Sequence, residues 1–276
     1  MSPLKLLRVS RPRFWIYVLG PLLVGAGAII NTNTSLISWQ LLALALYFTL
    51  PANLLIYGVN DIFDYESDKH NAKKQGYEEL VEKNEHRLIT LAILATNLPF
   101  LLLLPHLEWQ AIVSIIVFLL LGIFYSAPPI RAKTKPFLDS ASNILYMMPG
   151  LAGFFVAGGS NLSPFLVIAA GLWCMAMHAY SAAPDVAADN IAGMSTIATT
   201  LEEKNTVLLC LELYVTAFIF SAGIIGFPWM AIAAAPYIIL MGLSYANLNK
   251  LKYYYRLFPY INTAVGMYLF FLAILK

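Results

Sequence analysis

The stretch NLLIYGVNDIFDYESDKHN, residues 53–71, begins inside an apolar run and leaves it through three aspartates. On a helix, Asp61, Asp64 and Asp68 are spaced i, i+3 and i+7, so they share one face. Carboxylates at the end of a membrane helix are costly unless they are paired, hydrated or bound to a cation. Oxygen ligands suit Mg²⁺, which commonly completes its shell with water and substrate phosphates. The stretch therefore predicts a Mg²⁺ site, and a solvated acidic cap outside the helix is the simpler alternative.

A second acidic stretch, HAYSAAPDVAADNIAGMST, occupies residues 178–196. Asp185 and Asp189 are spaced i and i+4, and His178 falls on the same stripe if the helix continues. Pro184 predicts a kink or a restart of the helix at this point. Two acidic clusters, each closing an apolar span, match what two Mg²⁺ ions and one diphosphate require. We therefore expect the two clusters to face each other across one cavity.

The composition predicts a multi-pass membrane protein. Of the 276 residues, 60% are hydrophobic and only 12% are charged, which is unlike a soluble domain. The net charge of +2 gives no indication of a nucleic-acid partner. Cys174 and Cys210 lie in apolar runs without metal-ligand spacing, which favours a packing role for both.

We expect a single all-α transmembrane domain over residues 1–276, in which nine helices surround a central cavity. The nine apolar runs are roughly residues 13–30, 40–60, 88–105, 110–127, 138–158, 164–183, 206–226, 229–248 and 258–275.

The basic residues of the loops predict the orientation of these spans. All Lys and Arg residues except Lys276 fall on one side of the nine-span arrangement: Lys5, Arg8, Arg11, Arg13, Lys69, Lys73, Lys74, Lys83, Arg87, Arg131, Lys133, Lys135, Lys204, Lys250, Lys252 and Arg256. Because positive charge is enriched in cytoplasmic loops, we expect the N-terminus and both acidic clusters on the cytoplasmic side of the cell membrane. The C-terminus is expected on the opposite side.

Three basic residues, Arg131, Lys133 and Lys135, follow the fourth apolar run in the segment YSAPPIRAKTKP, residues 125–136. At the mouth of a helix bundle they would neutralise the charge of a diphosphate. Contact with anionic lipid headgroups is the alternative explanation for each of them.

These motifs together resemble the UbiA superfamily of intramembrane prenyltransferases. The resemblance rests on N-D-x-x-D-x-x-x-D at Asn60–Asp68, D-x-x-x-D at Asp185–Asp189 and YSxPPxRxK at Tyr125–Lys133, and it covers nearly the whole chain. It implies a nine-helix fold whose central cavity opens laterally to lipid, with Mg²⁺ as the cofactor and an isoprenyl diphosphate as the donor. Metal-binding and catalytic roles are implied for Asp61, Asp64, Asp68, Asp185 and Asp189. Diphosphate contacts are implied for Asn60, Arg131 and Lys133, and we add Lys135 to this set.

The sequence departs from the members that prenylate aromatic acids. Those members usually follow the first motif with a turn of the type KPxxRP, whereas here residues 69–88 read KHNAKKQGYEELVEKNEHRL. This insertion and the second motif resemble the branch that elongates lycopene to longer carotenoids. Pro184 stands where many relatives place Lys, so no cationic diphosphate contact is carried over from that position.

We therefore predict Mg²⁺-dependent transfer of a short isoprenyl group, a C5 dimethylallyl group, from its diphosphate to lycopene or a related hydrophobic carotenoid. Ionisation of the allylic C–O bond leaves a carbocation, which aromatic faces stabilise. The candidate residues of this pocket are Asn53, Tyr57, Tyr125, Tyr146, His178 and Tyr180. Either His178 accepts a proton in this reaction or it is a packed helix residue.

Two other functions remain open from the residues alone. Transfer to an aromatic or quinone precursor, of the 4-hydroxybenzoate or menaquinone type, requires a site for a polar ring, which Asn143, Asn262 or Arg131 would have to supply. A divalent-cation transporter would place its acidic residues near the middle of the membrane. The aspartates here gather toward one face instead.

Overall fold

The computed structural model describes residues 2–30, 37–69, 79–191 and 193–275, and the side chains of Ser67 and Asp68 lie outside the described part. The described residues form α-helices and short 3₁₀ segments without a strand among them, which confirms the all-α prediction. Contacts group the chain into two compact units. The first consists of Met1–Arg131, Met148–Gly159 and Leu272–Lys276, and the second of Ala132–Met147 and Ser160–Phe271. One domain over residues 1–276 stays a prediction.

The first unit holds the N-terminal helices and one helix from the middle of the chain. Its helices are α1 (Pro3–Val9), α2 (Ile16–Ile30), α3 (Trp39–Tyr47), α4 (Leu50–Phe63), α5 (Tyr65–Asp68), α6 (His86–Asn97), α7 (Trp109–Phe124) and α9 (Met148–Val156). Its 3₁₀ segments cover Pro12–Phe14, Lys83–Glu85 and Leu98–His106. Helix α3 begins where the Ser38 side chain accepts a hydrogen bond from the Leu41 N–H at 3.2 Å, an ordinary N-cap.

The second unit contains the long helices of the C-terminal half. Its helices are α8 (Leu138–Ala141), α10 (Pro164–Ala182), α11 (Val186–Ile191), α12 (Ile197–Ile225), α13 (Phe227–Ala246) and α14 (Leu251–Leu275). Its 3₁₀ segments cover Ala132–Thr134, Ser142–Met147, Ala183–Asp185 and Leu248–Lys250. Helix α12 is kinked at Glu202, whose φ is 64°.

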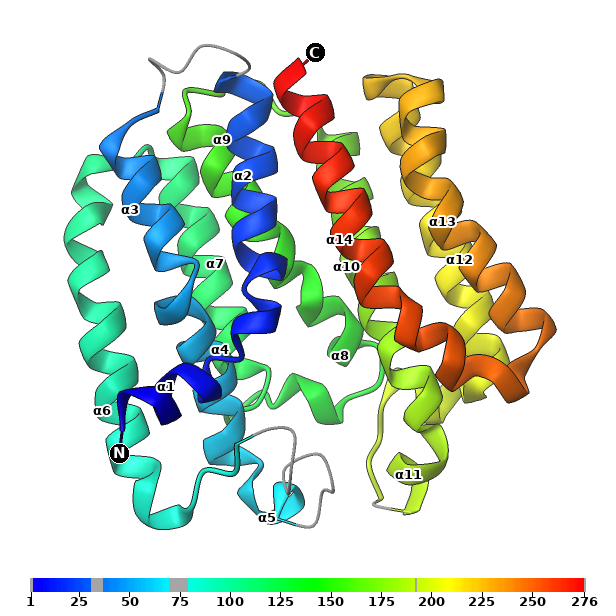
Figure 1. Ribbon diagram of the computed structural model, residues 1–276, viewed down its shortest axis with the longest axis horizontal. Helices are drawn as coiled ribbons and strands as arrows, with labels where there is room; N and C mark the ends of the chain where they lie inside the picture. The colour runs from blue at the N-terminus through cyan, green and yellow to red at the C-terminus, as the bar shows by residue number, and fades with distance from the viewer. Residues whose placement is uncertain (1, 31–36, 70–78, 192, 276) are drawn as a thin grey trace. The chain divides into compact units, whose positions relative to one another are not determined.

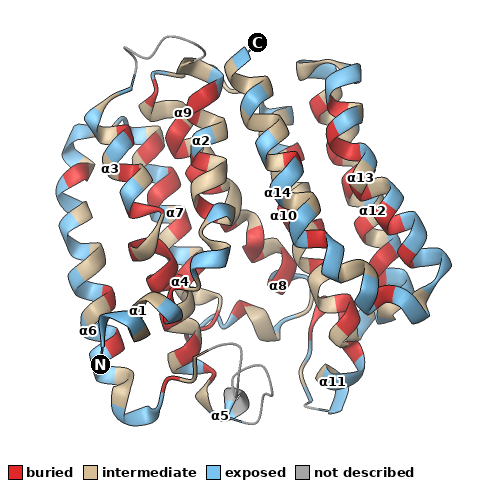
Figure 2. Cartoon of the chain, viewed as in Figure 1, coloured by how far each residue is buried: buried red, intermediate tan, exposed pale blue. Residues whose placement is uncertain are grey.

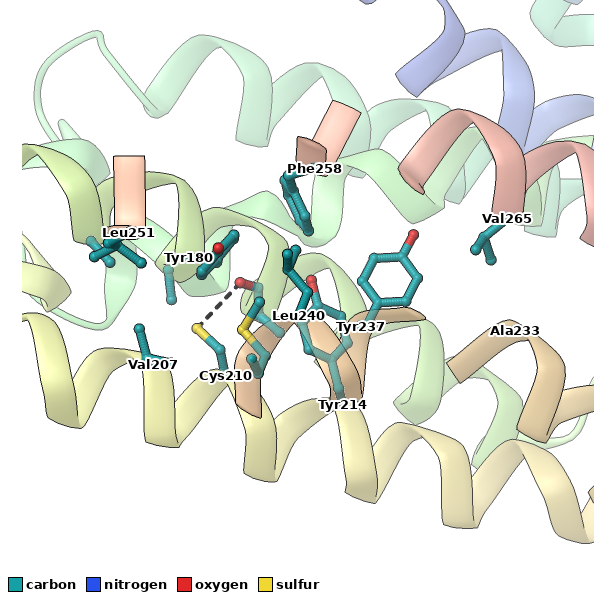
Figure 3. Packing of buried hydrophobic residues seen from close by; sticks show 14 of the residues in the cluster. Tyr180, Val207, Cys210, Tyr214, Ala233, Tyr237, Leu240, Leu251, Phe258 and Val265 are labelled. Carbon is teal, nitrogen blue, oxygen red and sulfur yellow. Dashed lines mark hydrogen bonds between the residues drawn. The ribbon is translucent and has the colours of Figure 1, made fainter. Parts of the chain in front are cut away.

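Aromatic side chains fill the core of the second unit (Figure 3). The rings of Trp173 and Tyr237 meet edge to face with their centroids 4.5 Å apart, and Tyr180 meets Phe258 in the same way at 5.1 Å. The hydroxyl of the buried Tyr180 shares a hydrogen bond of 2.8 Å with Ser244. Such rings combine a large buried area with a satisfied polar group, so this core joins α10, α13 and α14.

Helices α2 and α9 of the first unit lie side by side and approach closely at glycines (Figure 1). A Cβ atom at Gly25 would lie 1.9 Å from the carbonyl oxygen of Gly150, and one at Gly153 would lie 2.3 Å from that of Leu22. Only a residue without a side chain fits at either position. This is the close backbone contact that small residues allow between membrane helices.

We expect Gly25→Ala and Gly153→Ala each to destabilise the protein by about 1–3 kcal/mol, because the added methyl group must push the two backbones apart. The measurement is the midpoint of thermal unfolding in detergent. Gly223→Ala in α12 is the matched control, since a Cβ there meets nothing within 4 Å and alanine favours the helix by roughly 1 kcal/mol. Unchanged midpoints in both Gly25→Ala and Gly153→Ala would contradict this packing.

The helices suit a membrane. Seven described helical segments are long and apolar enough to cross one, and α7 is a shorter apolar helix. Helix α6 carries many exposed residues (Figure 2), among them Leu88, Leu91 and Leu94, which is the pattern of a lipid-exposed face. The chain is therefore a multi-pass membrane protein.

The prediction of nine spanning helices is not confirmed. The fifth apolar run, residues 138–158, is divided among α8, the 3₁₀ segment Ser142–Met147 and α9, each too short to span. Polar side chains in this run bond the local backbone: Ser142 donates to the Leu138 carbonyl at 2.6 Å and Asn143 to the Asp139 carbonyl at 2.8 Å. Such bonds compete with a regular helix. They explain why the run is broken here, although its hydropathy is that of one continuous span.

Candidate active site

The first aspartate motif lies at the C-terminal end of α4. Asp61 belongs to the last turn of the helix, and Asp64 ends it, its N–H donating to the Asn60 carbonyl at 2.9 Å. The two aspartates are only 2% and 6% exposed. Burial and the negative end of the helix dipole both disfavour ionised carboxylates here. The position therefore requires cations.

Two arginines from distant parts of the sequence supply positive charge to this end of α4. The guanidinium of Arg11 donates to Asp61 Oδ1 at 3.0 Å. Arg131 lies with its Nη2 3.8 Å from Asp64 Oδ1. The structure thus brings the YSAPPIR segment, residues 125–131, to the first motif, together with a residue from the N-terminus.

Asn60 ties these elements together. Its side-chain nitrogen donates to Asp64 Oδ2 at 2.6 Å and to Ser126 Oγ at 3.0 Å. One amide group therefore orients the second aspartate and anchors the segment that carries Arg131. This is the support that a ligating carboxylate needs in order to keep its orientation.

The predicted helix through all three aspartates is wrong in its extent. Helix α4 ends at Phe63, Asp64 lies at a bend, and Tyr65–Asp68 forms the separate short helix α5. The contacts of Asp64 with Asn60 and Arg131 hold it at this bend, and sequence spacing does not reveal them. The side chain of Asp68 and residues 70–78 of the insertion lie outside the described residues.

The second aspartate motif follows a break in α10, as Pro184 predicted. The α-helix ends at Ala182, Ala183–Asp185 forms a 3₁₀ turn and α11 restarts at Val186. Asp185 and Asp189 are both half-buried in the second unit. Of the two lysines expected at the diphosphate, Lys133 is half-buried and Lys135 is exposed.

The donors of the first motif fit a hard cation. Asp61 and Asp64 offer carboxylate oxygens on neighbouring turns, and such ligands suit Mg²⁺. Among the residues that the structure describes, no three His, Cys, Asp or Glu side chains gather into one metal-binding group. The shell of a bound ion would thus need further oxygens from substrate, from water or from residues outside the described part.

The candidate aromatic residues lie in different surroundings. Tyr57 lies beneath the guanidinium of Arg11, with 4.5 Å between the Arg11 Cζ and the ring centroid. Tyr125 and Tyr146 are half-buried. Tyr180 is fully buried in the core of the second unit, so packing accounts for it, and its role beside a carbocation stays a prediction.

The buried candidate Asn53 has a local structural role. Its side chain donates to the carbonyls of Phe48 and Thr49, at 3.2 and 2.6 Å. These carbonyls lie at the break between α3 and α4, where Pro51 cannot donate a backbone hydrogen bond. Asn53 thus supplies a side-chain donor to two carbonyls at this break, and its place in an acceptor pocket stays a prediction.

Sequence reasoning missed Asp139, a fully buried carboxylate in the second unit. Its Oδ1 accepts from the Ser140 N–H at 2.7 Å, and its Oδ2 accepts from the Ile197 N–H at 2.8 Å, at the start of α12. His178 Nε2 lies 4.0 Å from the same Oδ2. An aspartate inside an apolar run was the available signal, because such residues are rare in membrane segments without a partner.

Comparison with known proteins places this geometry in context. The model of the UbiA prenyltransferase family matches residues 18–273. A lycopene elongase/hydratase of Haloarcula japonica is 40% identical over 95% of this chain and 88% of its own length, and one of Haloferax volcanii is 37% identical over 94% and 85%. A UbiA homolog from Archaeoglobus fulgidus, solved with GPP and Mg²⁺, superposes with a TM-score of 0.73 at 21% identity, covering 98% of this chain and 99% of that one.

Proposed function

Because this chain belongs to the UbiA prenyltransferase family, we propose that it transfers a short isoprenyl group from its diphosphate to lycopene or a related carotenoid. The chain is a prenyltransferase, and its acceptor, its C5 donor and its dependence on Mg²⁺ are the proposed parts. The observation that carries the proposal is the similarity to lycopene elongase/hydratases over nearly the full length of both chains. The buried aspartates of the first motif supply the chemistry that such a reaction needs.

In this proposal Asp61, Asp64, Asp68, Asp185 and Asp189 provide the carboxylates that hold Mg²⁺. A bound divalent cation neutralises the charge that grows on a leaving diphosphate. Asn60 of the first motif and Arg131 of the segment 125–131 would orient the diphosphate oxygens, with Lys133 and Lys135 as further cations. The hydrogen bonds of Asn60 to Asp64 and Ser126 support this role, since they fix the motif before substrate arrives.

The chain's residues then have four tasks once the allylic C–O bond breaks and its electron pair leaves with the diphosphate. Arg131 and the lysines bind the departing anion. Aromatic faces, with Tyr57, Tyr125 and Tyr146 as candidates, stabilise the carbocation by about 0.5–2 kcal/mol for each ring. The protein also excludes water until a terminal C=C of the acceptor forms the new C–C bond. The resulting tertiary cation loses a proton or takes up water, and His178 is the candidate proton acceptor.

An uncharged acceptor agrees with the polar groups of the membrane helices. The amide of Asn143 donates to the Asp139 carbonyl at 2.8 Å, and Asn262 accepts from Tyr237 at 2.8 Å. Arg131 lies beside Asp64 and is assigned to the diphosphate in this proposal. These contacts already engage the groups that would have to bind the carboxylate of an aromatic acid, and a buried carboxylate without such donors is expensive. A polyene needs only apolar burial, worth roughly 25 cal/mol per Å².

The proposal includes the membrane orientation, with the N-terminus and the aspartate motifs in the cytoplasm and the C-terminus outside. The distribution of Lys and Arg among the loops supports it. A cytoplasmic site also has direct access to soluble C5 diphosphates.

We expect the purified protein to prenylate lycopene, and not 4-hydroxybenzoate, when either acceptor is supplied in matched micelles with dimethylallyl diphosphate and Mg²⁺. The reason is that Asn143 and Asn262 already form hydrogen bonds within the protein and that Arg131 lies beside Asp64. Products are identified by liquid chromatography with mass spectrometry. Geranyl diphosphate in a parallel reaction tests the C5 donor. Prenylated benzoate beside unchanged lycopene would contradict the carotenoid acceptor and leave the family assignment intact.

A further inference from the structure

Arg11 lies at the first motif and has no role in the reaction proposed above. Its side chain is 15% exposed, and Nη2 donates to Asp61 Oδ1 at 3.0 Å. The guanidinium plane also covers the ring of Tyr57, four residues before Asp61. An arginine that is paired with a carboxylate and stacked on a ring is held at a defined place. The residue therefore acts on Asp61 directly.

The N-terminal segment is built to present this side chain. Arg11 has φ 51° and ψ 69°, a left-handed conformation that costs an L-residue about 1–2 kcal/mol. Helix α1 just before it is anchored by Lys5, whose Nζ lies 2.5 Å from Glu85 Oε2. After it, the indole of Trp15 donates to the Ser10 carbonyl at 3.1 Å. These contacts hold the turn so that Arg11 points to Asp61 rather than to solvent.

The contact has a consequence for metal binding. Mg²⁺ lies about 2.0–2.1 Å from its oxygen ligands. An ion bound to Asp61 Oδ1 would therefore lie within about 5 Å of the guanidinium nitrogen, where two positive charges repel each other strongly in a buried site. A diphosphate changes this balance, because its oxygens give the guanidinium an alternative anion with good bidentate geometry.

From this geometry, and resting on the proposed function, we propose that Arg11 makes Mg²⁺ binding at Asp61 depend on bound diphosphate. Without substrate, the guanidinium is the counter-ion of Asp61 and competes with the metal. When the diphosphate is present, Arg11 turns from Asp61 to the phosphate oxygens and leaves the carboxylate to Mg²⁺. Arg11 is thus a residue that couples the two ligands, and the coupling is reciprocal, as linkage requires.

The test measures binding of Mg²⁺ to the full-length protein by calorimetry, with and without dimethylallyl thiolodiphosphate, an analogue that resists ionisation. We expect Arg11→Gln to bind Mg²⁺ alone at least about fivefold more tightly than the wild type, the lower end of ordinary coupling. The gain in Mg²⁺ affinity on adding the analogue should shrink by a similar factor. Arg13→Gln is the matched control, because Arg13 is exposed and stacks on Phe14, and its Mg²⁺ affinities should equal those of the wild type.

Tyr57→Leu is the second variant, which removes the ring beneath Arg11 and should tighten binding of Mg²⁺ alone about twofold or more. Equal or weaker binding of Mg²⁺ alone in both Arg11→Gln and Tyr57→Leu would overturn the proposal. If Arg11→Gln does not fold, the result for Tyr57→Leu decides. A wild type that binds no Mg²⁺ even with the analogue would instead remove the proposed function, and the role of Arg11 with it.

Discussion

Asp61→Asn and Asp64→Asn are each expected to lower turnover about a thousandfold while the protein stays folded. A metal held by carboxylates contributes several kcal/mol to the stabilisation of a developing anion, and each 1.36 kcal/mol is tenfold in rate. The amide has nearly the shape of the carboxylate, but it lacks the negative charge that holds the cation. Because both buried side chains lie beside arginines, each neutral variant also leaves its neighbouring arginine with a weaker partner.

The measurement is single-turnover formation of prenylated product at saturating Mg²⁺, with the thermal midpoint recorded for each variant. Glu66→Gln is the matched control, since Glu66 follows Asp64 closely but is exposed and paired with Lys69 and Lys83. Its turnover should stay within about twofold of the wild type, as is usual for exposed pairs. Activity near that of the wild type in Asp61→Asn or Asp64→Asn would exclude a metal ligand at that position.

Removal of divalent cations is expected to abolish transfer completely, and added Mg²⁺ is expected to restore it. The acidic donors of both motifs are oxygen ligands, which select hard cations. Ca²⁺ should restore transfer poorly, because its bonds of about 2.3–2.6 Å and higher coordination number do not reproduce the Mg²⁺ geometry. The assay follows the prenylated acceptor after treatment with a chelator and dialysis. Full transfer by the chelated, metal-free protein would contradict the metal-dependent mechanism.

The features that could be predicted from the sequence are those that depend on residues close together in the chain. The all-α class follows from long apolar runs, and the break after α10 follows from the inability of Pro184 to continue a helix. The first motif was visible because Asp61 and Asp64 leave an apolar run on the same face, and the structure finds both buried. The predicted extent of that helix is wrong. Asp64 lies where the helix ends, and its side chain contacts Arg131, which is far along the chain.

The features that stayed hidden depend on contacts between distant residues. In the sequence Arg11 is only one of the basic residues that predict orientation, yet a left-handed turn brings it to Asp61, fifty residues away in the sequence. Asp139 gave no motif, and its role emerges only where α12 begins at Ile197. Polar residues that bond their own backbone also interrupted a run that hydropathy made continuous, as Ser142 does.

Product analysis in lycopene-producing cells tests most directly whether the protein transfers an isoprenyl group to lycopene. The full-length chain is expressed beside an Asp64→Asn control, and the extracted carotenoids are analysed by mass spectrometry. The account predicts that lycopene is converted to carotenoids carrying one or two added five-carbon units, with or without added water, and that the control accumulates unchanged lycopene. Unchanged lycopene in both strains, with a prenylated aromatic or quinone precursor in the strain that carries the active protein, would contradict it.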